Sequence, residues 1–449
     1  MPDERPVAPS GEGATHHPRR RAGGFGRSLG PGLITGAADD DPSGISTYSQ
    51  AGAAFGYASL WIALVSYPLM AAVQLMCARV GLVARRGLAS VLRQHYPRPL
   101  LWAACALLLG ANTLNIAADL AGMAAGARLL TGLPASPFVP AFAVAIVVLL
   151  AYVSYARVVR VFKWLTTVLF AYVLAAFLSH PDWGAVLRGT VLPRISLSRD
   201  YLLIIVALLG TTISPYLFFW QASQEAEEVA ARERAAAVRR ASPECADEPV
   251  EPRPVHERRV QRAVRADVLF GMLVSNVIMY FVILTAAATL HAAGLTDVQT
   301  AAEAAAALRP LAGRGAALLF TLGIVGTGML GVPVLAGSGA YAVAEAAAWR
   351  GSMDDTPNTA PHFYGIIAAS MAVGTALTFA HVSPIRLLFW SAVVNGLCAP
   401  PLIVLVLVVC NDRRVMGAHV NGRALNAIGG VAAAVMAAAG LALLVTIAR

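Results

Sequence analysis

The chain has 449 residues, of which 57% are hydrophobic and only 13% are charged. Its mean hydropathy is +0.65. Soluble globular proteins carry about 25% charged residues, so this composition argues against a water-soluble domain. The formal net charge of +9 does not indicate a nucleic-acid partner, because the basic residues gather in short segments between apolar runs, as they do in membrane proteins. The five cysteines are scattered, and their spacing predicts neither a disulfide framework nor a metal site.

Apolar runs long enough to cross a membrane, about 20 residues each, recur along the whole chain. They predict an all-α integral membrane protein with about eleven transmembrane helices. The expected spans are 29–53, 57–84, 100–130, 139–158, 163–179, 202–221, 266–292, 316–348, 364–379, 385–409 and 425–447. The expected organisation is a disordered cytoplasmic tail (1–28), a first five-helix repeat (29–181), a second five-helix repeat (200–410, with a cytoplasmic, partly helical loop at 222–265) and helix 11 (423–449).

The positive charges of the connecting segments predict how the chain is oriented. Segments 85–98, 157–163, 225–265 and 413–423 are rich in arginine, and all of them lie on the same side if the N-terminus is cytoplasmic. Two outward segments also carry arginines, which weakens this bias without reversing it. No cleavable signal peptide is expected in the polar first 28 residues. The sequence thus predicts a multi-pass protein of the cell (inner) membrane with a cytoplasmic N-terminus.

The first expected span is interrupted near its middle by charged and helix-breaking residues. Residues 39–41 are three consecutive aspartates, and Pro42, Ser43 and Gly44 follow them. A charged side chain at this depth costs several kcal/mol and therefore indicates a function. Because Pro42 cannot continue the helical hydrogen bonds and Gly44 adds backbone freedom, we expect the helix to unwind here. The Asp41 carboxylate would then face an interior cavity.

The sixth expected span contains a second interruption at the matching position. Between Gly210 and Tyr216, small polar residues that include Thr211 and Ser214 precede Pro215. Paired interruptions in corresponding helices are the sequence sign of a substrate site in an inverted-repeat transporter. A single proline can also merely kink a membrane helix, but the aspartates and the matched positions favour the substrate site. The sequence therefore predicts two inverted five-helix repeats with helices 1 and 6 broken.

The residue types around the breaks predict the kind of substrate. A carboxylate beside unwound carbonyl groups forms an oxygen-rich site suited to a hard cation. An anionic substrate would instead favour half-helix N-termini without the acid. Asp39 and Asp40 could supply charge to an inner vestibule rather than bind directly. Asn276, Thr327 and Asn395 could bind the waters of a hydrated ion, or could make only interhelical hydrogen bonds.

These motifs resemble those of the NRAMP family of divalent-metal transporters, over nearly the whole chain after the tail. That family carries a DPGN motif in helix 1 and an MPH motif in helix 6, on a leucine-transporter-like fold of eleven or twelve helices. Here residues 41–44 read DPSG and residues 214–216 read SPY. The resemblance implies a divalent metal ion as the transported substrate, with no enzymatic activity and no cofactor.

The sequence departs from the family pattern at the metal-ligand positions. Gly44 replaces the asparagine ligand of helix 1, and Ser214 replaces the methionine ligand of helix 6. Loss of a thioether relaxes selection toward hard ions, and a wider oxygen-lined site suits an ion that keeps its waters, as Mg²⁺ does. The pattern is similar to the NRAMP-related magnesium transporter branch. The candidate metal-site positions are Asp41, Gly44, Ser214, Ile213, Thr211, Asp40 and Asn395.

The family's proton route is altered as well. Its helix-3 aspartate and glutamate correspond here to Asp119 and Gly122, and its two helix-6 histidines correspond to Tyr216 and Gln221. Histidine is the side chain best suited to titrate near neutral pH. Its replacement predicts transport without proton coupling of the family type.

We therefore favour alternating-access transport of a hydrated divalent cation, Mg²⁺ or Mn²⁺, by a monomer in the lipid bilayer. The alternative on the same fold is a proton-coupled Mn²⁺/Fe²⁺ importer, which the missing methionine and histidines disfavour. A carrier of organic substrates such as amino acids is disfavoured by the aspartates at 39–41. A membrane enzyme or receptor is disfavoured because the chain shows no nucleophile–base pair, zinc-ligand spacing or phosphate loop.

Overall fold

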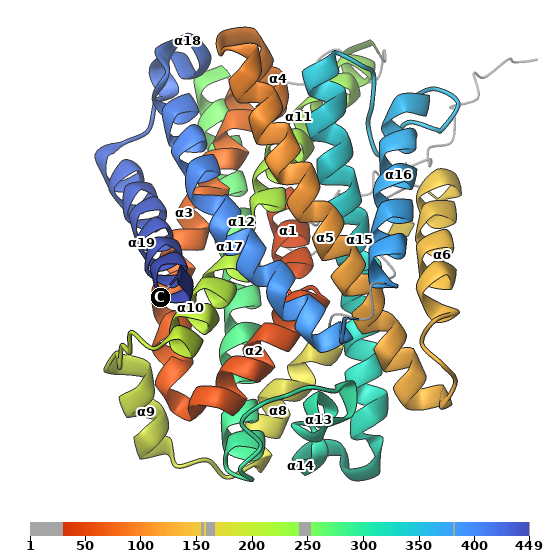
Figure 1. The fold of residues 1–449 in the computed structure, drawn as a ribbon. Helices are drawn as coiled ribbons and strands as arrows, with labels where there is room; N and C mark the ends of the chain where they lie inside the picture. Colours follow the sequence, from red (N-terminus) through yellow and green to blue (C-terminus); the bar gives the residue numbers. More distant parts are fainter. Residues whose placement is uncertain (1–29, 154–156, 159–166, 242–252, 380–381, 449) are drawn as a thin grey trace, which may run out of the picture.

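The computed structural model describes residues 30–153, 157–158, 167–241, 253–379 and 382–448, and in these residues it contains helices and no strands (Figure 1). The predicted disordered tail (1–28) lies outside the described residues. So do the expected start of the fifth span at residue 163 and residues 242–252 of the predicted loop. The described parts of that loop are largely helical, because the helices on both sides extend into it.

The long helices form one bundle, and short helices cover its two ends (Figure 1). The first half of the chain contains α1 (Pro31–Asp39), α2 (Pro42–Phe55), η1 (Gly56–Ser59), α3 (Leu60–Ala84), α4 (Leu88–His95), α5 (Arg98–Thr131), α6 (Phe138–Tyr152), η2 (Thr167–Leu169), α8 (Phe170–Leu178) and α9 (Trp183–Val191). The second half contains α10 (Arg199–Thr212), α11 (Pro215–Ala241), α12 (Arg253–Ala286), η4 (Ala287–His291), α13 (Ala301–Ala306), α14 (Arg309–Ala312), η5 (Gly313–Gly315), α15 (Ala316–Ala347), α16 (Pro361–Thr378), α17 (Pro384–Asn411), α18 (Arg413–Met416), η6 (Gly417–His419) and α19 (Arg423–Ala448).

Among the described residues, seven helical segments are long and apolar enough to cross a membrane. Each of the eleven expected spans is helical in its described part, but four fall short of this criterion. Helix 1 is divided by its break, α6 has 15 residues and α8 has 9, and α16 is less apolar. The qualifying segments are Pro42–Ala84, Arg98–Thr131, Arg199–Ala237, Arg258–His291, Arg309–Ala347, Pro384–Asn411 and Arg423–Ile447.

The outer surface of the bundle is apolar where these helices face outward. Large hydrophobic side chains such as Leu64 on α3, Val144 on α6 and Leu441 on α19 are more than half exposed. A helix satisfies its own backbone hydrogen bonds, so such a surface is compatible with lipid. The fold is that of a membrane protein.

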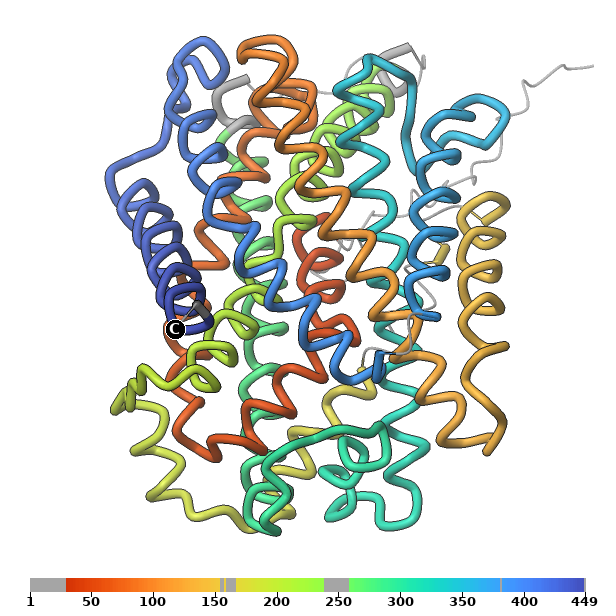
Figure 2. The backbone as a smooth tube through the Cα atoms, viewed as in Figure 1, coloured from red at the N-terminus to blue at the C-terminus, as the bar shows by residue number. Residues whose placement is uncertain are grey.

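Both helix breaks lie where the sequence predicts them, and Figure 2 shows them near the middle of the bundle. α1 ends at Asp39 and α2 begins at Pro42, so the first break contains Asp40 and Asp41. α10 ends at Thr212 and α11 begins at Pro215, so the second contains residues 213–214. In both cases proline takes the first position of the second half-helix, where its missing N–H leaves no hydrogen bond unmade.

α1 packs against α12 through glycine residues. A Cβ added to Gly32 would lie 2.6 Å from the backbone nitrogen of Val268, and one added to Gly36 would overlap the carbonyl group of Gly271. The backbone N–H of Gly32 also donates to Oδ2 of Asp267 at 2.7 Å. This carboxylate satisfies a free donor at the positive end of α1. Backbone contacts and this polar cap therefore help to hold α1 against α12.

Candidate functional site

Asp41 is the N-cap of α2, and hydrogen bonds hold both of its carboxylate oxygens. Oδ1 accepts from the backbone N–H of Gly44 at 2.8 Å and from the Ser43 hydroxyl at 2.6 Å. Oδ2 accepts from Nδ2 of Asn115 on α5 at 2.9 Å. Asp41 is buried, and a buried carboxylate is costly unless its oxygens are paired. The three donors stabilise the ionised form and fix its direction at the break.

Asn115 is a site residue that the sequence analysis missed. It donates to Asp41, and its own Oδ1 accepts from Nδ2 of Asn395 on α17 at 3.4 Å. The three side chains connect α2, α5 and α17 at the depth of the first break. The available signal was an amide within an apolar span, which is the same signal that selected Asn395.

Gly44 brings the two breaks together. A Cβ added to Gly44 would lie 3.2 Å from Oγ1 of Thr211 on α10 and 3.2 Å from the hydroxyl oxygen of Tyr48. Both hydroxyls are buried and face each other, and neither has a further hydrogen-bond partner in the described part of the chain. A hydroxyl can make more than one hydrogen bond, so both oxygens keep capacity for a ligand or its bound water. Tyr48 was not among the residues expected from the sequence.

Ser214 uses its hydroxyl within its own half-helix. Oγ lies 2.9 Å from the carbonyl oxygen of Gly210 and 2.7 Å from that of Thr211. These carbonyls are at the end of α10, where helical partners are missing. Ile213 is buried in the break with φ −116° and ψ 56°, so its backbone is not helical. The ligand roles expected for Ser214 and Ile213 stay predictions.

Two of the three consecutive aspartates share one partner, and the third has others. The Ser275 hydroxyl on α12 lies 2.8 Å from Oδ2 of Asp39 and 3.2 Å from Oδ1 of Asp40. The other carboxylate oxygen of each is buried and unpaired among the described residues. Asp41 instead faces α5. Within the described residues, no group of three or more His, Cys, Asp or Glu side chains is arranged to hold a metal ion, so carboxylates alone do not form a site.

Tyr216 and Gln221, which the sequence analysis expects at the family's two histidine positions, connect α11 to α1. The Tyr216 hydroxyl donates to the carbonyl of Ala38 at 2.9 Å. Oε1 of Gln221 accepts from the Thr35 hydroxyl at 2.6 Å, and its Nε2 donates to Glu225 at 3.2 Å. Both side chains thus hold α1 by hydrogen bonds, a role that requires no titration.

Asp119 and Gly122 lie on α5 beside the first break. Asp119 follows Asn115 by one helical turn and is fully buried, and its carboxylate faces the backbone N–H of Ser43 at the first break without a close side-chain partner among the described residues. A Cβ added to Gly122 would lie 2.9 Å from Cδ1 of Leu388 and 3.5 Å from Cβ of Pro42. A glutamate at position 122 would displace this packing. Asp119 is therefore a buried acid without a side-chain hydrogen-bond partner among the described residues.

The polar candidate Asn276 makes interhelical hydrogen bonds, and the surroundings of the first break also include α15. Asn276 donates to the carbonyl of Ala63 at 2.8 Å and accepts from Ser66 at 3.0 Å, so it joins α12 to α3. α15 approaches the first break through Gly331, where an added Cβ would lie 3.0 Å from Cβ of Asp41. Small residues on α15 thus allow the close approach of the broken helix.

Two broken helices, whose interruptions meet at a buried carboxylate, define a transporter of the leucine-transporter-like fold, with two inverted five-helix repeats. The manganese transporter of Eremococcus coleocola has this fold: its structure matches with a TM-score of 0.73 at 18% identity, over 92% of this chain and 85% of that one. Mhp1, a nucleobase-cation-symport-1 family transporter, matches with a TM-score of 0.52 at 15% identity, over 94% and 92%.

The chain belongs to the Nramp family (natural resistance-associated macrophage protein-like), which matches residues 32–446. It is therefore a transporter and not an enzyme. Among similar relatives, the divalent metal cation transporter MntH of Chromohalobacter salexigens is 25% identical over 412 residues, covering 90% of this chain and 87% of the relative. MntH of Pectobacterium carotovorum is 26% identical over 411 residues, covering 89% and 90%.

Proposed function

We propose that this protein carries divalent metal cations across the membrane by alternating access, and that its main substrate is hydrated Mg²⁺. Membership of the Nramp family and the divalent-metal transporters among its relatives support the first part. The single observation that carries the second is the pair of replacements at the breaks, Gly44 for asparagine and Ser214 for methionine. Mn²⁺ is the second candidate ion.

The residues around Gly44 fit an ion that arrives with water. Mg²⁺ usually keeps several waters and is held by one or two carboxylates. Asp41 is the carboxylate at the break, and its hydrogen bonds to Ser43 and Asn115 hold it in place. The hydroxyls of Tyr48 and Thr211, which face each other beside Gly44, would accept hydrogen bonds from the waters or donate hydrogen bonds to them. All of these atoms are oxygen or nitrogen, and hard oxygen ligands favour Mg²⁺ over softer ions.

We further infer that metal transport is not coupled to protons in the family manner. Tyr216 and Gln221 replace the two histidines, and both are engaged with α1. The competing function is proton-coupled Mn²⁺/Fe²⁺ import. Asp119 favours it, because this buried acid has no side-chain hydrogen-bond partner among the described residues and lies one turn from Asn115. Asp119 is thus the group to test for proton movement.

The deciding experiment is uptake into proteoliposomes, with Mg²⁺ and Mn²⁺ compared at equal driving force and with a pH-sensitive dye in the lumen. We expect saturable Mg²⁺ uptake that Asp41→Ala abolishes, and no metal-driven acidification. Strong preference for Mn²⁺ over Mg²⁺ would overturn the magnesium proposal. Acidification that disappears in Asp119→Asn would establish the proton-coupled alternative instead.

A double variant tests selectivity at the breaks. Gly44→Asn with Ser214→Met restores an amide oxygen and a thioether, so Mg²⁺ would have to lose water while Mn²⁺ or Cd²⁺ gains a softer ligand. We expect loss of Mg²⁺ transport and tighter Mn²⁺ or Cd²⁺ binding by calorimetry. Thr211 and Tyr48 lie 3.2 Å from the new Cβ, so both must shift. Ser214→Ala is the control, because it removes the hydroxyl without adding a thioether.

We also propose a monomer in the cell (inner) membrane with a cytoplasmic N-terminus. The arginine-rich segments support this orientation: Arg93 on α4 and Arg413 on α18 belong to helices that lie at the same end of the bundle (Figure 1). Positive segments are retained on the cytoplasmic side. Labelling of single cysteines at Arg93 and Arg413 in whole cells by an impermeant reagent tests it, and labelling at either position contradicts it.

A further inference from the structure

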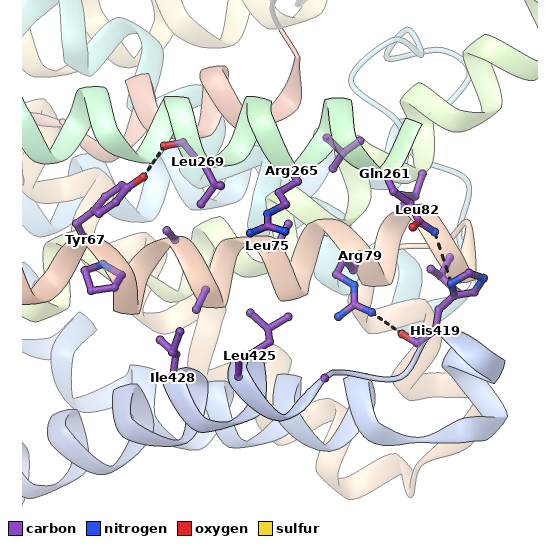
Figure 3. A pocket seen from close by; sticks show the side chains of 17 residues that line it. Tyr67, Leu75, Arg79, Leu82, Gln261, Arg265, Leu269, His419, Leu425 and Ile428 are labelled. Atoms are coloured by element: carbon purple, nitrogen blue, oxygen red, sulfur yellow. Dashed lines mark hydrogen bonds between the residues drawn. The ribbon is translucent and has the colours of Figure 1, made fainter. Parts of the chain in front are cut away.

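A cavity of about 520 Å³ lies away from the helix breaks, between α3, α12, α19 and the segment 417–422 (Figure 3). Its volume is within the range of about 300–1,000 Å³ that is usual for small-molecule sites. α19 is the least buried of the seven candidate spans, with 33% of its apolar window buried. The cavity therefore lies at the perimeter of the bundle, where the helices meet lipid.

The lining of this cavity changes from apolar to basic along the helices. Leu75 of α3 and Leu425 and Ile428 of α19 belong to the apolar part. Arg79 of α3 and Arg265 of α12 supply the charge of the basic part, which Gln261 and His419 also line (Figure 3). No aspartate or glutamate is among its described lining residues. The cavity thus combines an apolar groove with an uncompensated positive end.

The two arginines are held differently. Nη2 of Arg79 donates to the carbonyl of His419 at 2.6 Å, and Nη1 donates to Oδ1 of Asn421, so this guanidinium is fixed in direction. Arg265 is exposed and has neither an ion pair nor a hydrogen bond within the described part of the chain. Figure 3 shows its side chain reaching from α12 toward α3. A guanidinium without a partner, beside an apolar wall, is suited to bind an oxyanion.

The depth of the arginines corresponds to the level of lipid headgroups. Arg79 lies five residues before Ala84, the end of α3. Arg265 lies seven residues after Arg258, the start of its membrane-spanning segment. At 1.5 Å per residue, Arg79 is roughly 8 Å from the end of α3 and Arg265 is roughly 11 Å from the start of its candidate span. Long basic side chains in this zone reach the membrane surface.

We propose that this cavity binds an anionic phospholipid. Its phosphate would contact Arg265 and Arg79, and one acyl chain would lie along Leu75, Leu425 and Ile428. Basic pockets between transmembrane helices are suited to acidic headgroups. A free phosphate would leave the apolar groove empty, and a zwitterionic lipid would bring no net charge to match the arginines.

The site is connected to the broken helix through α12. Asp267 follows Arg265 by two residues and accepts the hydrogen bond from Gly32 at the start of α1. A lipid phosphate at Arg265 therefore acts on the turn of α12 that holds α1. If the protein is a transporter that moves α1, as its proposed function implies, the lipid will also affect the transport rate.

Lipid retention measured by native mass spectrometry tests the proposal. The purified full-length protein is titrated with phosphatidylglycerol, with phosphatidylcholine, and with glycerol phosphate as a headgroup without acyl chains. Arg265→Gln removes the unpaired charge, and Arg262→Gln is the matched control, because Arg262 lies on the same helix but does not line the cavity. Ala424→Trp fills the cavity, and Ala427→Trp is its control on the next turn of α19.

We expect the wild type to retain phosphatidylglycerol more strongly than phosphatidylcholine, and glycerol phosphate not to compete. One arginine near a membrane surface contributes about fivefold to the affinity for anionic lipid, so Arg265→Gln should weaken retention by about that factor while Arg262→Gln does not. Ala424→Trp should abolish it and Ala427→Trp should not. Equal losses in both arginine variants, unchanged retention in Ala424→Trp, or full competition by glycerol phosphate would each overturn the proposal.

Discussion

Replacing Asp41 by asparagine removes one negative charge and keeps the shape of the side chain. Asparagine is as good an N-cap as aspartate, so the bond from the Gly44 N–H is retained. The new amide nitrogen, however, would face Nδ2 of Asn115, which now donates to Asp41 at 2.9 Å. Asn115 must turn its amide, and it then loses the bond from Asn395 unless that residue turns as well. One such bond is worth about 1 kcal/mol, so the variant should fold.

The effect on ion binding should be much larger. Removing one partner of a buried charge pair costs about 3–5 kcal/mol, and each 1.4 kcal/mol is about tenfold in affinity. Asp41→Asn should therefore weaken divalent-cation binding on the order of 100-fold or more. The difference between a small cost in folding and a large cost in binding is the signature of a ligand.

Two measurements on the same preparation check this. Calorimetry or a fluorescent dye reports ion affinity and uptake in proteoliposomes, and thermal unfolding reports the fold. Asp40→Asn is the matched control, since it removes the same charge one residue away, where the carboxylate lies against Ser275. Ion affinity in Asp41→Asn within a few-fold of the wild type would refute the assignment, and a loss found only in Asp40→Asn would move the site toward α12.

Three further substitutions probe the surroundings of the site. Gly331→Val should reduce uptake, because an added Cβ lies 3.0 Å from Cβ of Asp41. A cost of about 1.4 kcal/mol in ion binding corresponds to about a tenfold loss, and wild-type uptake would contradict this. Gln221→Leu removes the bond to Thr35, so a cysteine at Ala37, two residues along α1, should react faster with a soluble thiol reagent, and an unchanged rate would count against it. Tyr216→Phe leaves a carbonyl of α1 without its donor, which should lower the thermal unfolding temperature in a melting scan, whereas an unchanged temperature would argue that the bond is not stabilising.

The helix breaks could be predicted from the sequence because local chemistry decides them. Pro42 and Pro215 each start a half-helix, and Asp41 caps the first of these two half-helices. Such effects act within one turn and need no knowledge of neighbouring helices. The family motifs are read from the same local residues, so family membership was predicted correctly.

The partners of these residues could not be predicted, because they depend on how each helix is rotated in the bundle. Asn115 and Tyr48 belong to the site because α5 and α2 turn these side chains toward Asp41 and Gly44. Ser275, which lies against two of the aspartates, is likewise distant in sequence. Span ends were predicted less well, since hydrophobicity alone does not show where a broken helix, or a helix such as α6, ends.

The glycine contact between α1 and α12 bears on how readily the two helices separate. Backbone meets backbone at Gly36 and Gly271, so separation frees no interlocked side chains and leaves none to be repacked on return. The polar contacts between these two helices, from Asp267 and Ser275, are worth about 1–3 kcal/mol each. Weak polar contacts, and not interlocked side chains, thus hold α1 against α12. A ligand that binds either the packed or the separated arrangement of these helices a few kcal/mol better than the other can reverse which arrangement is populated.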